Sequence, residues 1–170
     1  MLTDSPTDGI SQDERNWAML VHLTALLTVF TALATGGLGY IVALLAPLAL
    51  YVYFAGRSDY AAFHALQATV FQALAGIVYV AVAALAGTVV ATAWVVTGAL
   101  SVLLVGVALV PMAFGLTLIA GVELLGLPVL MLAYALRGAY LVSEGREFSY
   151  PVIGEMVARS LRRPVGAAAG

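Results

Sequence analysis

Residues 65–122 read ALQATVFQALAGIVYVAVAALAGTVVATAWVVTGALSVLLVGVALVPMAFGLTLIAGV, without one Asp, Glu, Lys, Arg or His. A helix needs about 20 residues, each rising about 1.5 Å, to cross the hydrocarbon core of a bilayer. The stretch is therefore long enough for more than one crossing. It predicts a protein that passes through a membrane several times.

The composition of the whole chain agrees with this prediction. Of its 170 residues, 63% are hydrophobic and 9% are charged, whereas soluble domains are typically about 45–50% apolar and about 25% charged. The net charge of −2 and the lack of a basic cluster argue against nucleic-acid binding. Because the chain has no cysteine, disulfides, thiol catalysis and cysteine-ligated metals are excluded.

The first two membrane segments are readily placed. Ser11 and Glu14 fit a capping box, so a helix should begin there in water and enter the membrane near Trp17. The glycine-rich residues 36–39 predict a turn, after which a second span should run to about Ala55.

The following segment is harder to divide. Between Thr69 and Leu136, its length allows two, three or four crossings. Glycine and proline mark the places where helices could break. The candidate breaks are Gly87-Thr88, Thr97-Gly98, Pro111, Gly115 and Gly126–Pro128.

The distribution of the arginines indicates whether the number of crossings is even or odd. Cytoplasmic loops carry an excess of basic residues, so Arg15, Arg57 and the five arginines after residue 136 should share the cytoplasmic side. This requires an even number of spans, and we favour four, with one pair of long or broken helices holding the surplus apolar residues near 95–112. The expected fold is an all-α polytopic transmembrane helix bundle of about four spans, with broken or extra apolar helices accommodated between 88 and 128.

This topology divides the chain into three parts. Residues 1–10 should be a disordered tail, residues 11–142 the transmembrane helical domain, and residues 143–170 a cytoplasmic C-terminal tail. Within that tail, residues 152–161 could form a short interfacial helix. We expect a multi-pass protein of the inner (cytoplasmic) membrane with both termini in the cytoplasm.

Polar side chains mark one face of the expected third helix. At intervals of three or four residues this face carries the polar Tyr60, His64 and Gln67 and then the apolar Phe71, with Gln72 beside them. A phenol, an imidazole and an amide at the membrane surface should pack against protein or water rather than acyl chains. This face is either a binding or gating site or a structural surface that hydrogen-bonds a neighbouring helix.

His22 lies on the first span at a depth similar to that of His64, so we expect the two side chains to be neighbours. Two histidines on different helices could ligate one haem. Nothing else in the sequence favours haem, and we interpret both histidines as structural. We therefore expect no cofactor and no metal.

Two further features are candidates for function or packing. Glu123 is the only acid in the apolar region, and an intramembrane carboxylate suggests proton or ion coupling unless it is hydrated near a helix break at Gly126. Ala83, Gly87 and Ala91 are spaced four apart, which predicts close packing of two membrane helices. Because no catalytic grouping of residues is evident, we expect no enzymatic activity.

Three segments, in order, resemble a known family: 13–23 (DERNWAMLVHL), 63–67 (FHALQ) and 145–151 (GREFSYP). They are similar to a widespread bacterial family of small four-span membrane proteins of unknown function, itself similar to the Tic-twenty component of the chloroplast inner-envelope import channel. Two departures are Ser149, where a basic residue is common, and a longer apolar stretch at 75–130. The matching positions are His22, His64, Ala65, Gln67, Phe71, Gln72, Gly145, Tyr150 and Pro151.

The resemblance implies a four-helix membrane protein without a cofactor. By analogy to the import component, we expect a non-enzymatic protein that assists protein insertion or solute passage. The alternative is an accessory subunit packed against a larger respiratory, photosynthetic or transport complex, since a conduction path normally needs intramembrane polar groups. The lipid bilayer and other membrane protein subunits are the expected partners, and nucleic acid is not.

The arginine distribution generates a test of topology. We predict that reporters fused near Ile10 and at Gly170 both report a cytoplasmic location, because an even number of crossings returns the chain to its starting side. The measurement is the activity of paired cytoplasmic and periplasmic reporters at each site. An active periplasmic reporter at either end would contradict the topology.

Overall fold

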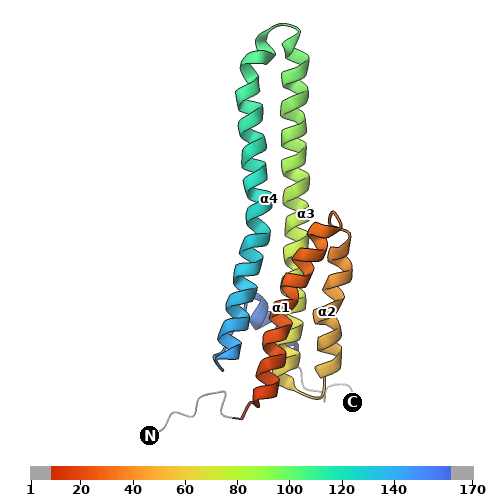
Figure 1. Cartoon of the computed structure of the whole chain (residues 1–170), viewed down its shortest axis with the longest axis vertical. Coiled ribbons are helices and arrows are strands. Elements are labelled where there is room, and N and C mark those ends of the chain that lie inside the picture. Colours follow the sequence, from red (N-terminus) through yellow and green to blue (C-terminus); the bar gives the residue numbers. More distant parts are fainter. Residues whose placement is uncertain (1–8, 162–170) are drawn as a thin grey trace, which may run out of the picture. The chain divides into compact units, whose positions relative to one another are not determined.

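The computed structural model of the protein describes residues 9–161, and these residues are organised almost entirely as helices. The predicted all-α class is confirmed. The predicted tail at 1–10 lies mostly outside the described residues, as do Arg162 and Arg163. The described helices are α1 (Gln12–Ala34), α2 (Gly39–Phe54), α3 (Asp59–Ser101), α4 (Val105–Ser143) and α5 (Ile153–Leu161) (Figure 1).

Three of these helices, α1, α3 and α4, are long and apolar enough to cross a membrane. α2 is apolar but has 16 residues, so it extends about 24 Å against a hydrocarbon core of about 30 Å. With 43 and 39 residues, α3 and α4 are each about twice as long as that core is thick. The multi-pass architecture with one pair of long helices is confirmed, and a count of four crossings includes α2.

The breaks predicted at glycine and proline in the long segment are wrong. α3 is continuous through Gly87 and Gly98, and α4 is continuous through Pro111, Gly115 and Gly126–Pro128. Helices in membranes tolerate both residue types, because neighbouring groups satisfy the backbone atoms that they leave free. Gly and Pro are therefore weaker indicators of a helix end in this chain than they are in soluble proteins.

The reversal between α3 and α4 lies instead at residues 102–104. Leu104 has φ 60°, and its N–H donates to the Ser101 carbonyl at 3.0 Å. The Ser101 hydroxyl donates to the Thr97 carbonyl at 2.8 Å. A Cβ at Gly106 would collide with Thr97 and Ser101, so this glycine is needed for the close approach of the two helix ends.

The described chain forms two compact units. Unit 1 comprises residues 9–74 and 131–161, and unit 2 comprises residues 75–130. Unit 2 thus holds the C-terminal part of α3 and the N-terminal part of α4, which run antiparallel (Figure 1). The uncharged stretch of the sequence falls mainly in this unit.

Small side chains form the contact between the two helical segments of unit 2. Ala86 and Ala113 are buried, which allows the helices to approach closely. The indole N–H of Trp94 donates to the Thr117 hydroxyl at 3.0 Å across the contact. Unit 2 is therefore a helical hairpin that exposes most of its apolar side chains, as expected for a surface covered by lipid.

Unit 1 begins with the capping box that the sequence predicts. The Ser11 N–H donates to the Glu14 carboxylate at 2.9 Å, and the Glu14 N–H donates to the Ser11 hydroxyl at 3.2 Å. α1 and α2 then form an antiparallel hairpin (Figure 1). Ala65 and Ala68 of α3 are buried in one cluster with Val21 of α1, which lets the two helices pack closely.

α4 ends in a Schellman motif at the start of the next segment. The Arg146 N–H donates to the Leu141 carbonyl at 2.9 Å, and the Gly145 N–H donates to the Val142 carbonyl at 3.0 Å. Gly145 has φ 72°, and a Cβ there would lie 2.5 Å from the Arg15 guanidinium of α1. The backbone conformation favours glycine at this position, whereas the flexible Arg15 side chain could move to admit a Cβ.

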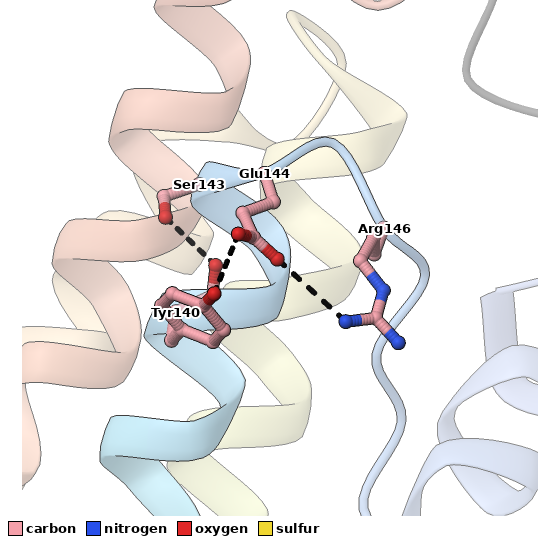
Figure 2. Close-up of polar contacts among 4 residues, drawn as sticks. All are labelled: Tyr140, Ser143, Glu144 and Arg146. Carbon is pink, nitrogen blue, oxygen red and sulfur yellow. Dashed lines mark hydrogen bonds and ion pairs between the residues drawn. The ribbon is translucent and has the colours of Figure 1, made fainter.

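Side-chain contacts at the same helix end are drawn in Figure 2. The Tyr140 hydroxyl donates to Glu144 at 2.6 Å, and Glu144 pairs with Arg146 at 3.6 Å. The Ser143 hydroxyl donates to the Tyr140 carbonyl at 2.7 Å. These groups are solvent-exposed, so they shape the helix end but contribute little to stability.

The segment after α4, residues 144–161, is called the strap below. It belongs to unit 1 and packs on the helices of that unit. Its Phe148 and Tyr150 join Ala18 and Val142 in a buried apolar cluster. Tyr150 is among the largest fully buried side chains of the described residues. The strap therefore contributes to the core of unit 1.

A tight turn leads from Tyr150 into α5. The Ile153 N–H donates to the Pro151 carbonyl at 2.7 Å, and Val152 between them has φ 66°. A β-branched residue rarely adopts this conformation, which costs on the order of 1–3 kcal/mol. α5 begins one residue later than the interfacial helix predicted at 152–161, and its Gly154 and Val157 are buried.

Candidate functional site

Three segments of unit 1 bring four polar side chains together inside the protein. His22 comes from α1, His64 and Gln67 come from α3, and Tyr150 comes from the strap. Their exposed fractions are 0% for His22 and Gln67 and 2% for His64 and Tyr150. Buried polar groups in an apolar protein are costly unless they are hydrogen-bonded, so their partners decide what the site can do.

The two histidines contact each other directly. His22 Nε2 lies 3.2 Å from His64 Nδ1, and the rings meet edge to face with centroids 5.3 Å apart. The other ring nitrogen of His22, Nδ1, lies 3.0 Å from the Tyr150 hydroxyl. The Gln67 amide nitrogen lies 3.3 Å from His64 Nδ1.

The backbone of the strap fixes the orientation of the Gln67 amide. The Tyr150 N–H donates to Gln67 Oε1 at 2.9 Å, and Gln67 Nε2 donates to the Phe148 carbonyl at 3.4 Å. One amide therefore satisfies a donor and an acceptor of the strap, as a neighbouring β-strand would. These two bonds attach the strap to α3.

One set of proton positions is consistent with all the hydrogen bonds between these side chains while both rings are neutral. Because Gln67 Nε2 is a donor, His64 Nδ1 must be the acceptor of its bond, and His22 Nε2 then donates to the same atom. His22 Nδ1 is left as the acceptor for the Tyr150 hydroxyl. Burial raises the pKa of the Tyr150 hydroxyl, which keeps its proton available for this bond.

Aromatic rings close the site from the strap side. Tyr150 stacks on Phe71 of α3 with ring centroids 4.0 Å apart and planes inclined by 8°. Phe148 meets His22 edge to face at 5.3 Å. The Phe148 ring rests on Gly138 of α4, where an added Cβ would lie 2.6 Å from it. Four chain segments therefore enclose the polar group.

A second polar layer lies further along α1. The Thr28 hydroxyl donates to Gln72 Oε1 at 2.7 Å, and Gln72 Nε2 donates to the Thr24 hydroxyl at 2.8 Å. The Tyr40 hydroxyl of α2 donates to the main-chain carbonyl of Gln72. Both the oxygen and the nitrogen of the Gln72 side-chain amide therefore bond α3 to α1.

Sequence reasoning named Gln72 but missed its partners Thr24, Thr28 and Tyr40, and it did not assign Tyr150 to the His22 site. Thr28 is buried in α1, as His22 is, and Thr24 lies one turn before Thr28, so this spacing of four was the available signal. Threonine is common in membrane helices because its hydroxyl bonds its own backbone, so the signal is weak.

Tyr60 lies at the edge of the site, with its ring centroid 4.6 Å from that of His64. Its hydroxyl is buried without a hydrogen-bond partner among the described residues, and so is Arg15 Nε. Burial raises the cost of both orphaned groups. Tyr60, His64, Gln67, Gln72 and His22 are therefore all at or near the α1–α3 contact.

The remaining predicted residues lie in unit 2, apart from this site. Glu123 is exposed and lies inside the continuous helix α4, so it is not at a helix break. Within the stripe, Gly87 and Ala91 are exposed, Ala83 is half-buried, and no atom lies within 4 Å of a Cβ built on Gly87. The small residues at the hairpin contact are others, as described above.

The histidine pair is poorly arranged for a metal. Both nitrogens that face each other are already used in a hydrogen bond, and no third histidine or carboxylate joins them within residues 9–161. A haem between the rings would have to replace that bond. What the arrangement offers is a pair of buried, mutually hydrogen-bonded imidazoles covered by the strap.

Comparison with known proteins identifies relatives of the chain at the family level. Residues 13–157 match the MamF/MmsF family, described as the magnetosome magnetite crystal formation protein family. No curated protein and no solved structure matches the chain. The matched residues include all four members of the polar site.

This match corrects the resemblance drawn from short motifs. The segments at 13–23, 63–67 and 145–151 were interpreted as signs of a family similar to the Tic-twenty import component, and that interpretation is wrong. All three motifs lie within the matched residues. In the structure, these segments supply the buried site, so their spacing reflects packing of α1, α3 and the strap.

The Gln67 bonds generate a stability prediction. We expect Gln67→Leu to lower the free energy of unfolding by roughly 2–6 kcal/mol, because it leaves a buried N–H and a buried carbonyl unpaired at about 1–3 kcal/mol each. The matched control is Leu66→Met, a volume-conserving change one residue away that should cost less than about 1.5 kcal/mol. Denaturant titration in detergent measures both, and equal stability of the two variants would refute the assignment.

Proposed function

We propose a function from one premise: this chain belongs to the magnetosome magnetite crystal formation protein family. On that basis it acts in the magnetosome membrane, where it takes part in forming magnetite crystals. The carrying observation is the extent of the match, residues 13–157, which runs from the first turn of α1 to the buried Val157 of α5. The match covers all of unit 2 and most of unit 1.

The family assignment corrects the functions expected from the sequence. Assistance to protein insertion or solute passage was inferred from the import component, and the accessory-subunit alternative was inferred from a scarcity of intramembrane polar groups. The family match overturns both. The second inference also failed physically, because unit 1 holds two layers of buried polar side chains.

The charge distribution supports an orientation for the protein in that membrane. Within residues 9–161, every charged side chain except Glu123 belongs to unit 1. They gather at the start of α1, the α2–α3 turn and the end of α4, and the Ser58 hydroxyl joins two of these sites by donating to Glu14 at 2.6 Å. We place this arginine-bearing end, with both chain termini, on the cytoplasmic side.

We propose that the protein works without catalysing a reaction. The side chains of its polar site are buried, hydrogen-bonded to one another and packed against aromatic rings. Such a site favours a structural or regulatory role over turnover. The exposed apolar side chains of α3 and α4 offer a surface for lipid and for other membrane proteins of the same compartment.

Deletion of the gene in a magnetite-forming host tests the proposed function. We expect crystals of altered number, size or shape in electron micrographs, and a tagged copy of the protein enriched in isolated magnetosome membranes. Re-expression of the unmodified chain should restore the crystals.

The contradicting result is specific. Unchanged crystals in the deletion strain, together with a tagged protein confined to the general cell membrane, would rule out a role in crystal formation. Re-expression of Leu66→Met serves as the matched control, because this change lies outside the polar site and should restore crystals as the unmodified chain does.

A further inference from the structure

We propose that the strap, residues 144–161, is a protonation-sensitive latch: it stays docked on unit 1 while His22 and His64 are neutral and undocks when they gain protons. The starting observation is geometric. The strap covers a histidine pair whose facing nitrogens are 3.2 Å apart, and it bonds to that pair and its Gln67 neighbour through Tyr150. The ring nitrogens that would gain protons are therefore also the atoms that hold the strap in place.

The docked arrangement has no place for two protons. His64 Nδ1 accepts from His22 Nε2 and from Gln67 Nε2, so a proton there would face two N–H groups. A proton on His22 Nδ1 would force the Tyr150 hydroxyl to accept instead of donate. Two charged rings at this separation would also repel each other strongly in a buried site.

The surrounding charges do not compensate a buried imidazolium. Neither ring has a hydrogen bond or ion pair to a carboxylate among the described residues. In α5, Glu155 and Arg159 are exposed and pair with each other. The α2–α3 turn contributes Arg57, which is bound to Tyr53. The strap also carries Glu144 and Arg146, which pair with each other, and Asp59 begins α3. Further titratable or charged groups near this end include Glu14, Arg15, Tyr60, Glu147 and Tyr150.

Undocking reverses these restrictions. Removal of Phe148 and Tyr150 uncovers the rings at the charged end of unit 1, where water can reach them. A histidine in water takes up a proton below about pH 6.5. Each histidine that is neutral when docked and titrates when undocked shifts the equilibrium toward the undocked form about tenfold per pH unit below that value. The docked form is therefore fully favoured at higher pH and is lost as pH falls.

Backbone strain in the strap acts in the same direction. Val152 is held at φ 66° in the tight turn that follows Tyr150. The strain is maintained only while bonds on both sides hold the turn, and undocking releases it. The latch is thus closed by a few bonds at Gln67 and Tyr150 and opposed by stored strain.

The proposed function would supply a source of protons for this latch, although the latch itself does not depend on that function. Assembly of an iron oxide from iron ions and water releases protons from the water. The strap lies at the end of unit 1 that we place on the cytoplasmic side, so its release would report protons that leave the crystal compartment for the cytoplasm.

A thiol-labelling experiment on the purified full chain tests the latch. The chain has no cysteine, so Val157→Cys places one thiol on the buried face of α5, and Met156→Cys places one on its exposed face as the control. We measure maleimide labelling rates in detergent at about pH 7.5 and about pH 5.5. The ratio of the rate at 157 to the rate at 156 cancels the intrinsic pH dependence of the thiol.

We expect this ratio to rise at least about tenfold at the lower pH. In a chain that also carries His22→Gln and His64→Asn, which cannot titrate, the ratio should stay constant. Each single substitution should leave about half of the logarithmic response, and these variants serve if the double variant does not fold by circular dichroism and gel filtration. A constant ratio in the unsubstituted background, or an equal rise in the folded non-titrating variants, would overturn the proposal. Because the experiment uses purified protein, its result is independent of any crystal phenotype.

Discussion

The amide of Gln67 connects the elements of unit 1. It accepts from the Tyr150 N–H and donates to the Phe148 carbonyl, so it ties the strap to α3. The same nitrogen directs the His64 ring, which in turn orients His22 on α1. A single side chain therefore sets the tautomers of two histidines and the path of the chain after α4. Apolar contacts could not fix these orientations in the same way, because the hydrophobic effect is non-directional whereas a hydrogen bond depends on its angle.

The buried polar layers also solve a packing problem particular to membranes. Between apolar helices in lipid there is little hydrophobic driving force, so association depends on close packing and on hydrogen bonds between helices. Unit 1 uses both, with alanines at the α1–α3 contact and the amides of Gln67 and Gln72 between the helices. Unit 2 uses small residues and one bond from Trp94, and it exposes more of its apolar surface. The two units therefore differ in how firmly their sequences specify internal contacts.

Much of the architecture could be read from the sequence where one local rule decided the outcome. The capping box at Ser11, the membrane character of the helices and the long helix pair are of this kind. The helical face of His64 and Gln67 followed from spacing alone, and the structure places it against His22. The reversal at 102–104 could not be found, because it depends on the close approach at Gly106 rather than on a turn-forming residue. The role of Tyr150 was hidden for a related reason: its contacts are made with residues far away in the chain. The function was misjudged because short motifs record local packing and do not separate one family of small membrane proteins from another.

The central claim is that the Gln67 amide holds the strap in a defined position on unit 1. Amide hydrogen exchange at Tyr150 tests this most directly, since the N–H lies in a segment outside the helices and its bond to Gln67 protects it. The account predicts that in detergent at neutral pH this amide exchanges as slowly as the amides in the middle of α1, and that Gln67→Leu removes the protection. Exchange of the Tyr150 amide within about tenfold of the rate of an unstructured peptide would contradict the account.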